Sequence, residues 1–347
     1  MLSHTRSLRT VMLAVAGIAI AQGAQARSDE GALVVTASNT AANYLLVYRP
    51  DGTLLRRIST QGQGGVSGNS GGIAQNHERV AVVNFGSGSV SVFTKDPEHA
   101  TLHLESIIPT SGSPVSVAFG HEHLYVLTTA SVESHTASFA GISTKADGVA
   151  RLLLADGSAA QVGVLPDQVI VTEKTGDIET INLNKNGAVD GSPTLVAANL
   201  NAPFGLATRG NDAYVTIAHS NEVSLVRNDA ILTKVGPGQQ MAPCWVALDG
   251  PFLFSTNSPS HSLSRFAVYG QVITLDAEVA ATFNGNPTDI SYRAGRVAVV
   301  DANGTVSHLS TFDVDEDGDF TLKGVATIAG VATNGVAIIE PAAEEYD

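Results

Sequence analysis

A unit of about 44 residues recurs along the chain, and this repeat constrains the fold more than any other feature of the sequence. Each copy begins with a small residue or a proline, continues as an apolar strand, turns, and starts a second apolar strand. The clear openings are Ser113-Pro114-Val115-Ser116-Val117-Ala118, Ala202-Pro203-Phe204-Gly205-Leu206-Ala207, Ala242-Pro243-Cys244-Trp245-Val246-Ala247 and Asn286-Pro287-Thr288-Asp289-Ile290. With weaker copies included, the equivalent positions are 70, 114, 159, 203, 243, 287 and 333. A regular period of this length is typical of repeat architectures.

Each unit predicts four short antiparallel strands. In the unit that opens at Asn69, the second strand is Arg79 to Asn84, the third is Ser89 to Phe93 and the fourth is Thr101 to Ile107. Turns with Asp-Gly or Asn-Gly recur between third and fourth strands, and such pairs supply the positive φ angles of tight hairpins. These turns contain Asp51-Gly52, Asp147-Gly148, Asn186-Gly187 and Asp317-Gly318. Four-stranded units of this length, repeated radially, are the blades of a β-propeller.

The two ends of the repeat array predict how the ring closes. Residues 32 to 59 supply only the three outer strands of a blade, and Thr333 to Ile339 is an innermost strand without a blade of its own. Pairing the two leaves no open sheet edge. We therefore predict an all-β fold: a single seven-bladed β-propeller closed by pairing of the N- and C-terminal segments.

The first 26 residues have the pattern of a secretory signal peptide. Arg6 and Arg9 precede an apolar run from Val11 to Ile20, and Ala24-Gln25-Ala26 is a small-x-small cleavage site. The apolar run is shorter than the roughly 20 residues that a membrane-spanning helix needs. We expect cleavage after Ala26, a propeller formed by residues 27–347, and a secreted or periplasmic protein.

Charge and cysteine content exclude several kinds of partner. Lys and Arg number 19 against 33 Asp and Glu, a net charge of −14, whereas nucleic acids and anionic membranes attract basic surfaces. We therefore expect no nucleic-acid and no membrane partner. The single cysteine, Cys244, excludes an intramolecular disulfide and a cysteine-rich zinc site. No Gly-rich loop leads into a helix, so we expect no nucleotide cofactor, and none of another kind. We also expect a monomer.

Three segments carry a family pattern: Pro114-Val115-Ser116-Val117-Ala118, Val171-Thr172-Glu173-Lys174 and Ala242-Pro243-Cys244-Trp245-Val246-Ala247. They resemble the seven-bladed lactonase family, which includes 6-phosphogluconolactonases and 3-carboxymuconate cyclases, and in particular its secreted branch. The resemblance covers nearly the whole mature chain. It implies a propeller with a metal-free active site at the mouth of the central channel, built from His, Arg and Glu.

The chain keeps only one residue of that catalytic set. The family's histidine position is Val115, its Arg-His pair is Ala160-Gln161, and its Asn-Glu pair is Thr172-Glu173. The resemblance therefore implies the fold, and it offers Glu173 alone as an inherited catalytic residue, because a shared fold does not fix function.

Polar side chains are expected to converge on one mouth of the channel, where the innermost strands start and the loops between second and third strands lie. The candidate catalytic residues are Glu173 as general acid or base, with His135 or His219 as its partner. The candidate ligand-binding residues are Lys174, Gln161, Trp245, Asn84, Asn257 and Asp289, and His261 and Asp301 fall on the same rim. The stretch Thr128 to Ser138, with Glu133 and His135, reads as a long loop that could cover the site.

Each of these residues also has a simpler interpretation. Polar loop residues are usually just solvated, Glu173 and Lys174 can form a rim salt bridge worth under about 1 kcal/mol, and Trp245 can pack between blades. We predict no metal site. The two histidines of His121-Glu122-His123 lie at the opposite end of the blade, and the acids of Asp313 to Asp317 lack a closing glutamate because Gly324 stands in its place.

Two functions remain open on the sequence. In the first, the chain hydrolyses or forms a small lactone without a cofactor, with Glu173 as acid or base and Lys174 or Gln161 stabilising an oxyanion or a substrate carboxylate. In the second, it is a noncatalytic exported propeller that binds a small ligand or a protein partner. An open channel mouth favours the first, and a mouth filled by protein favours the second.

Overall fold

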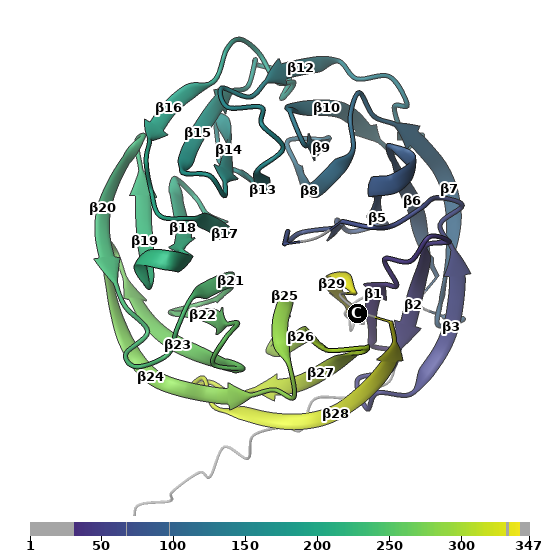
Figure 1. The fold of residues 1–347 in the computed structure, drawn as a ribbon. Coiled ribbons are helices and arrows are strands. Elements are labelled where there is room, and N and C mark those ends of the chain that lie inside the picture. Colours follow the sequence, from purple (N-terminus) through teal and green to yellow (C-terminus); the bar gives the residue numbers. More distant parts are fainter. Residues whose placement is uncertain (1–30, 67, 97, 331–332, 341–347) are drawn as a thin grey trace, which may run out of the picture.

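The computed structural model describes residues 31–66, 68–96, 98–330 and 333–340, and these form one ring of seven β-sheets around a central channel (Figure 1). The predicted signal peptide lies outside the described residues. Among the described residues, no helix is long and apolar enough to cross a membrane. The prediction of a seven-bladed propeller is confirmed.

Within each blade the strands follow one another from the channel outwards. Blade 1 contains β29 (Asn334–Ile339), β1 (Leu33–Ala37), β2 (Tyr44–Tyr48) and β3 (Leu54–Ser59). Blade 2 contains β4 (Ile73–Gln75), β5 (Arg79–Asn84), β6 (Ser89–Asp96) and β7 (Thr101–Pro109). Blade 3 contains β8 (Pro114–Gly120), β9 (His123–Thr128) and β10 (Ser131–Ser138), with β11 (Gly141–Ile142) and β12 (Gly148–Arg151) both paired to β10.

The remaining four blades are regular. Blade 4 contains β13 (Ala159–Val164), β14 (Gln168–Glu173), β15 (Asp177–Asn182) and β16 (Thr194–Ala197). Blade 5 contains β17 (Pro203–Arg209), β18 (Asp212–Ile217), β19 (Glu222–Arg227) and β20 (Ala230–Val235). Blade 6 contains β21 (Pro243–Asp249), β22 (Phe252–Asn257), β23 (Ser262–Tyr269) and β24 (Val272–Thr282). Blade 7 contains β25 (Asn286–Arg293), β26 (Arg296–Asn303), β27 (Val306–Val314) and β28 (Phe320–Ala329). Two 3₁₀ turns, η1 (Phe85–Ser87) and η2 (Ala218–Ser220), join second and third strands.

The ring closes in blade 1 as predicted. Strand β29 pairs antiparallel with β1, with Val34 opposite Ile338 and Thr36 opposite Val336. The Thr36 hydroxyl also donates a hydrogen bond to the carbonyl of Gly335 at 2.7 Å. The last described strand of the chain is therefore the innermost strand of the first blade.

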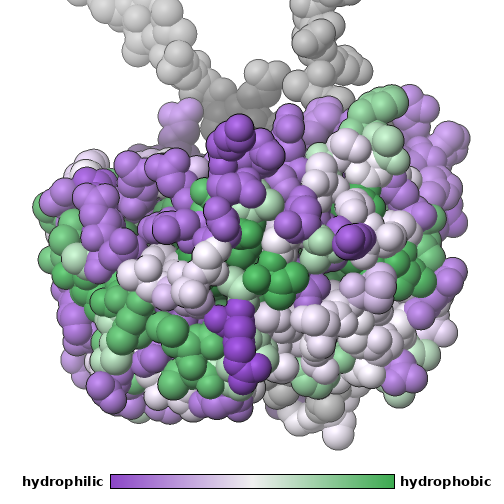
Figure 2. Space-filling view, turned by 90° about the horizontal axis from the view of Figure 1, so that it is seen from above, coloured by the Kyte–Doolittle hydropathy of each residue, from purple (hydrophilic) through white to green (hydrophobic). Residues whose placement is uncertain are grey.

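Hydrophobic side chains pack between neighbouring blades rather than inside each sheet. The second strand of blade 2 shows the pattern, because Val80 and Val82 pack in the cluster shared with blade 1, whereas Ala81 and Val83 pack in the cluster shared with blade 3. A strand buried on both faces reads as a continuous apolar run. Each fully buried valine or leucine contributes about 1.5–3 kcal/mol. Figure 2 looks onto the outer edges of the blades, where hydrophobic patches remain between more hydrophilic rims.

The prediction of a long loop from Thr128 to Ser138 is wrong. Only Thr129 and Ala130 form a turn, and the rest of the stretch is strand β10. Glu133 and His135 lie opposite Val126 and Leu124 of β9 inside the sheet. The extra length of blade 3 is at its outer edge, where the chain makes the short strand β11 before β12.

A candidate ligand site in the central channel

A segment of blade 2 crosses the channel mouth. The channel segment, residues 66 and 68–72, leads into β4 and reaches the middle of the ring, where Figure 1 shows it as dark blue-purple chain. Its described residues bond to four other blades. In blade 1 the Asn39 amide donates to the Val66 carbonyl at 2.8 Å, and in blade 3 the Val117 N–H donates to the Gly71 carbonyl at 2.8 Å.

Three hydrogen bonds hold Asn69 in the middle of the segment. Its amide Nδ2 donates to the carbonyls of Ala159 and Ala160, at 2.6 and 3.2 Å. The Lys174 ammonium donates to the Gly68 carbonyl at 3.1 Å and to Asn69 Oδ1 at 3.3 Å. Lys174 is thus bound to the channel segment, and burial lowers its pKa.

Asp289, from the innermost strand of blade 7, bonds to the segment from the far side of the channel. Its Oδ1 accepts a hydrogen bond from the Ser70 hydroxyl at 2.5 Å, and its Oδ2 accepts one from the Gly71 N–H at 3.1 Å. The Ile290 N–H also donates to Oδ1, at 2.8 Å. Burial raises the pKa of Asp289 to about 7, and these hydrogen bonds oppose the shift. Asp289 can therefore change charge near neutral pH.

Glycine is required where the segment touches its neighbours. Gly71 has a φ of 65°, and a Cβ there would lie 2.8 Å from the Ser116 hydroxyl. A Cβ on Gly72 would lie 2.0 Å from Asn334 Nδ2. Only a residue without a side chain allows the backbone to approach this closely.

Two cavities lie on either side of the channel segment. The mouth cavity, of about 200 Å³, lies among the starts of the innermost strands, and Gly68, Asn69, Phe204 and Trp245 line it. The inner cavity, of about 290 Å³, lies along the middle of the same strands. Its polar lining residues are Ser70, Gln161, Thr208, Asp289 and Ser291.

No Arg, Lys or His side chain lines either cavity within the described part of the chain. The inner cavity instead offers hydroxyls, an amide and a carboxyl group. Gln161 Oε1 accepts a hydrogen bond from the Leu206 N–H at 2.8 Å, so the amide is oriented by the next blade. Such a lining suits an uncharged ligand that carries hydroxyl or carbonyl groups, and it has no cation to neutralise a phosphate or a carboxylate.

Glu173 ends β14 but does not line either cavity. It is buried beside Glu179 of β15, and the register makes the two residues diagonal neighbours on one face of the sheet, because Glu179 lies opposite Val171. Glu179 Oε2 accepts a hydrogen bond from the Leu153 N–H at 3.1 Å. Neither oxygen of Glu173 accepts a hydrogen bond of ordinary geometry from a described residue.

Burial and neighbouring charge raise the proton affinity of both carboxyl groups. Burial and, to a smaller extent, the charge of Glu179 raise the pKa of Glu173 to about 8, whereas the Ala155 N–H opposes the shift. Burial also raises the pKa of Glu179 to about 7. The pair therefore retains at least one proton at neutral pH.

Asn84 and Asn257 occupy the same position in their blades as Glu173 does in blade 4. They end the second strands of blades 2 and 6, as Glu173 does in blade 4. Each donates its Nδ2 to a serine diagonally across on the third strand: Asn84 to Ser91 at 2.7 Å, and Asn257 to Ser264 at 2.8 Å. Glu173 and Glu179 take the positions of such an Asn-Ser pair. All three residues lie in the sheets rather than in the channel.

The predicted histidine partners do not reach Glu173. His135 is buried in β10, where its Nδ1 bonds to the Ser143 carbonyl at 3.0 Å and its Nε2 lies 3.5 Å from Glu133. His219 is an exposed residue of η2 whose ring centroid lies 6.5 Å from that of Phe204, beside the mouth cavity. No contact between Glu173 and either histidine is present among the described residues.

Other rim residues are divided between the channel and the blades. Trp245 is buried and packs edge-on against Phe204, with 5.4 Å between ring centroids, so it is a wall of the mouth cavity. Asp301 is buried in β26 and bonds to His308 Nδ1 at 2.8 Å, and burial raises its pKa. His261 is an exposed turn residue.

The structure adds site residues that the sequence patterns did not single out. Asn69, Ser70, Thr208 and Ser291 line the cavities or hold the channel segment. One available signal was the density of glycine, since six of the eleven residues from 62 to 72 are Gly. Glycine at such density marks backbone in close approach to other groups.

Comparisons with known proteins agree with the fold. No protein-family model and no curated protein matches the chain. A candidate 6-phosphogluconolactonase from Bacteroides uniformis superposes with a TM-score of 0.66 at 15% sequence identity, over 89% of this chain and 99% of the other. A second one, from Bacteroides fragilis, gives 0.65 at 16% identity over 91% and 100%. A Lactobacillus plantarum protein gives 0.66 at 16% over 89% and 99%. The chain therefore has the seven-bladed propeller fold that these candidate 6-phosphogluconolactonases share.

Proposed function

We propose that this chain is an exported, lactonase-like propeller that binds a small uncharged ligand in the inner cavity of its central channel, without a cofactor. The observation that carries the proposal is the cavity of about 290 Å³ lined by Ser70, Gln161 and Asp289 and by no cationic side chain among the described residues. Its volume suits a molecule of the size of a sugar or a sugar lactone. Export rests on the signal-peptide pattern of residues 1–26.

Binding rather than turnover is supported by the channel segment. It occupies the mouth where the lactonase family has its active site, and six hydrogen bonds from Asn69, Ser70, Gly71 and Lys174 fix its position. The histidine and arginine positions of the family are Val115 and Ala160 in this chain. A buried site without these residues retains groups that recognise hydroxyls, but it lacks the cation that would stabilise an oxyanion.

Titration calorimetry with glucono-1,5-lactone and with gluconate tests this proposal. The neutral lactone and the anionic acid differ mainly in charge, so we expect the lactone to bind at least about tenfold more tightly. The measurement is made near pH 6, where the lactone opens slowly. Gln161→Ala should weaken lactone binding, whereas Gln168→Ala, a glutamine of β14 outside both cavities, should leave it unchanged. Tighter binding of gluconate, or equal effects of the two variants, would exclude the site.

Cofactor-free lactone hydrolysis or formation is the second candidate function. One observation favours it. The pKa of Glu173 is raised to about 8, so its carboxyl group holds a proton that could be given to the alkoxide leaving the ring. In hydrolysis, water adds to the carbonyl carbon, the ring C–O bond breaks, the alkoxide takes this proton, and the proton lost by the attacking water returns to the Glu173 carboxylate. The position of Glu173 outside both cavities is why we place this function second.

A panel of lactones assayed with the wild-type chain and with Glu173→Gln separates the two functions. Our proposal predicts no turnover above the spontaneous rate for either protein. Turnover by the wild type that is lost in Glu173→Gln would establish the enzyme and replace the binding proposal.

A further inference from the structure

A second concave region lies at the opposite end of blades 2 to 4 from the channel mouth. Two cavities, of about 630 and 960 Å³, adjoin there and share four lining residues: His121, Glu122, His123 and Thr136. The smaller extends to Arg79 and Phe139, and the larger to Asn184, Lys185 and Asn186. We call the whole the underside groove. Its length suits an extended ligand better than a single small molecule.

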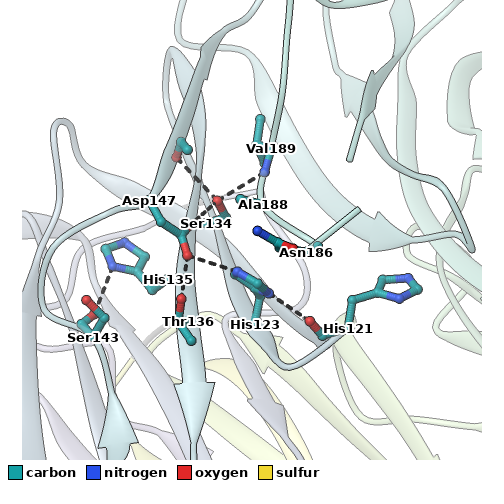
Figure 3. A network of polar contacts seen from close by, with 12 residues as sticks. His121, His123, Ser134, His135, Thr136, Ser143, Asp147, Asn186, Ala188 and Val189 are labelled. Atoms are coloured by element: carbon teal, nitrogen blue, oxygen red, sulfur yellow. Dashed lines mark hydrogen bonds and ion pairs between the residues drawn. The ribbon is translucent and has the colours of Figure 1, made fainter. Parts of the chain in front are cut away.

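A network centred on Asp147 fixes the floor of the groove (Figure 3). Asp147 Oδ1 accepts a hydrogen bond from the Ser134 hydroxyl at 2.6 Å, and Oδ2 accepts from the Thr136 hydroxyl at 2.5 Å. The His123 Nε2 lies 2.9 Å from the same Oδ2. The hydrogen bonds at Ser134, Thr136 and His123 outweigh burial and lower the pKa of Asp147, so it is ionised. A floor tied in this way is preorganised.

His123 is held on both sides. The other ring nitrogen of His123, Nδ1, lies 2.7 Å from the His121 carbonyl. Both ring nitrogens therefore lie within hydrogen-bond distance of an acceptor, which fixes the orientation of the ring.

Acidic side chains outnumber basic ones in and beside the groove. Arg79 is paired with Glu105 and Glu78, both at 2.7 Å. The exposed charged residues left on the lining are Lys185, Glu122 and Asp167. An acidic lining repels anionic ligands, whereas its carboxylates can accept hydrogen bonds from the hydroxyls of an uncharged ligand.

One wall of the groove presents an aromatic ring to solvent. Phe139, between β10 and β11, is 92% exposed, the highest value among the large hydrophobic residues that the structure describes. Its backbone is held in place because Arg79 Nη2 donates to its carbonyl at 3.2 Å, and Arg79 is itself buried. At the other end of the groove the exposed Asn186 side chain lies beside His123 (Figure 3).

We propose that the underside groove binds a neutral oligosaccharide. Sugar rings stack their C–H faces on exposed aromatic side chains, as Phe139 offers, and their hydroxyls bond to amides and carboxylates such as those of Asn186 and Glu122. The elongated shape matches a chain of sugar units, and the acidic lining disfavours an anionic one. This site is separate from the channel cavities and does not depend on the proposed channel ligand.

The test uses the full mature chain and three probes: cellohexaose, maltohexaose and N-acetylchitohexaose, each titrated by calorimetry. We expect at least one to bind with a Kd below about 1 mM. Phe139→Ala and Asn186→Ala should each weaken that binding, Phe139→Ala by at least about tenfold. Tyr269→Ala is the matched control, because Tyr269 is a 68% exposed aromatic of β23 outside the groove, and it should have no effect.

Melting curves of all variants confirm that they are folded. Gln161→Ala, in the channel, should leave oligosaccharide binding unchanged, which separates this site from the channel site. Failure of all three probes to bind below about 1 mM, or equal weakening by Phe139→Ala and Tyr269→Ala, would overturn the proposal.

Discussion

Three buried carboxyl groups hold protons at pH values where an exposed carboxyl group is ionised. Burial raises the pKa of Glu173 to about 8 and those of Glu179 and Asp289 to about 7. The unfolded chain ionises the same groups near pH 4. The folded protein therefore binds more protons than the unfolded chain between about pH 4 and pH 8.

The free energy of unfolding should consequently fall as the pH rises from 5 to 8. The contribution of each raised pKa is fully present below the unfolded value and is lost as the pH passes the folded value, with a slope of up to about 1.4 kcal/mol per pH unit for each group. Urea denaturation at pH 5, 6, 7 and 8 measures this slope. Glu173→Gln should make it shallower, because a neutral amide does not titrate.

Glu316→Gln serves as the control, since Glu316 is exposed in the turn between β27 and β28. It should keep the wild-type slope. Stability that is constant or rises from pH 5 to 8 would contradict the protonated state of the buried carboxyl groups.

Glu173 also shows what the sequence predicts at this scale. The strand pattern placed it correctly at the end of β14, since the apolar run before it fixes the strand boundary. Its burial could not be predicted, because the residues that approach it, such as Leu153 beside Glu179, come from the connection between blades 3 and 4. Asp289 was predicted to lie at the channel, and it lines the inner cavity.

At the scale of elements, the channel segment depends on close backbone packing. Its connections run to blades 1, 3, 4 and 7, so the segment ties opposite sides of the ring together. Gly72 packs beside Asn334 of β29, since a Cβ added at Gly72 would lie 2.0 Å from Asn334 Nδ2.

Gly72→Ala should destabilise the protein by about 1–3 kcal/mol, because its Cβ would lie 2.0 Å from Asn334 Nδ2 and displace the Asn334 side chain from its buried position. Gly236→Ala is a suitable comparison, because its Cβ would meet only the Asn221 carbonyl, at 3.2 Å. Thermal melting of both variants checks this. A Tm for Gly72→Ala as high as that of Gly236→Ala would mean that the segment does not pack against β29.

The acidic turn between β27 and β28 should not bind calcium tightly. Asp315 Oδ1 already accepts the N–H groups of Asp317 and Asp319, at 3.0 and 2.9 Å, as in an ordinary turn. A calcium loop has a bidentate glutamate at the position of Gly324. Here Gly324 is part of β28 and pairs with Thr311 of β27. We expect equal melting temperatures in EDTA and in millimolar calcium. A rise of more than about 3–4 °C with calcium would show a site that stabilises the fold.

Strand β10 illustrates where an element is hard to predict. Its sequence, Ser131-Val132-Glu133-Ser134-His135-Thr136, is mostly polar and resembles a loop. The polar side chains are buried because they bond within the molecule: Glu133 Oε1 accepts the Ser111 N–H at 2.7 Å, and Ser134 donates to Asp147. These partners lie outside the strand, so the local pattern does not contain them. The regular blades, by contrast, were predicted from alternation and turn residues.

At the scale of the whole molecule, the ring depends on a strand from the far end of the chain. Strand β29 contributes Val336, Ala337, Ile338 and Ile339 to the clusters on both sides of blade 1. Fully buried Val and Ile side chains are worth about 1.5–3 kcal/mol each, an appreciable part of a typical stability of about 5–15 kcal/mol.

Deleting residues 333–347 should therefore abolish cooperative unfolding, since blade 1 would lose its innermost strand. Deleting only residues 341–347 leaves β29 in place and should preserve the melting transition. Calorimetry of the two truncated proteins decides the matter. An unchanged Tm after the longer deletion would contradict closure of the ring by β29.

The central claim is that a small uncharged ligand occupies the inner cavity between the channel segment and the innermost strands. A crystal structure of the mature chain soaked with glucono-1,5-lactone tests this claim most directly. Our account predicts ligand density in contact with Gln161 and Asp289, and no ligand beside Glu173. Ligand density against Glu173, with the inner cavity empty, would contradict the account.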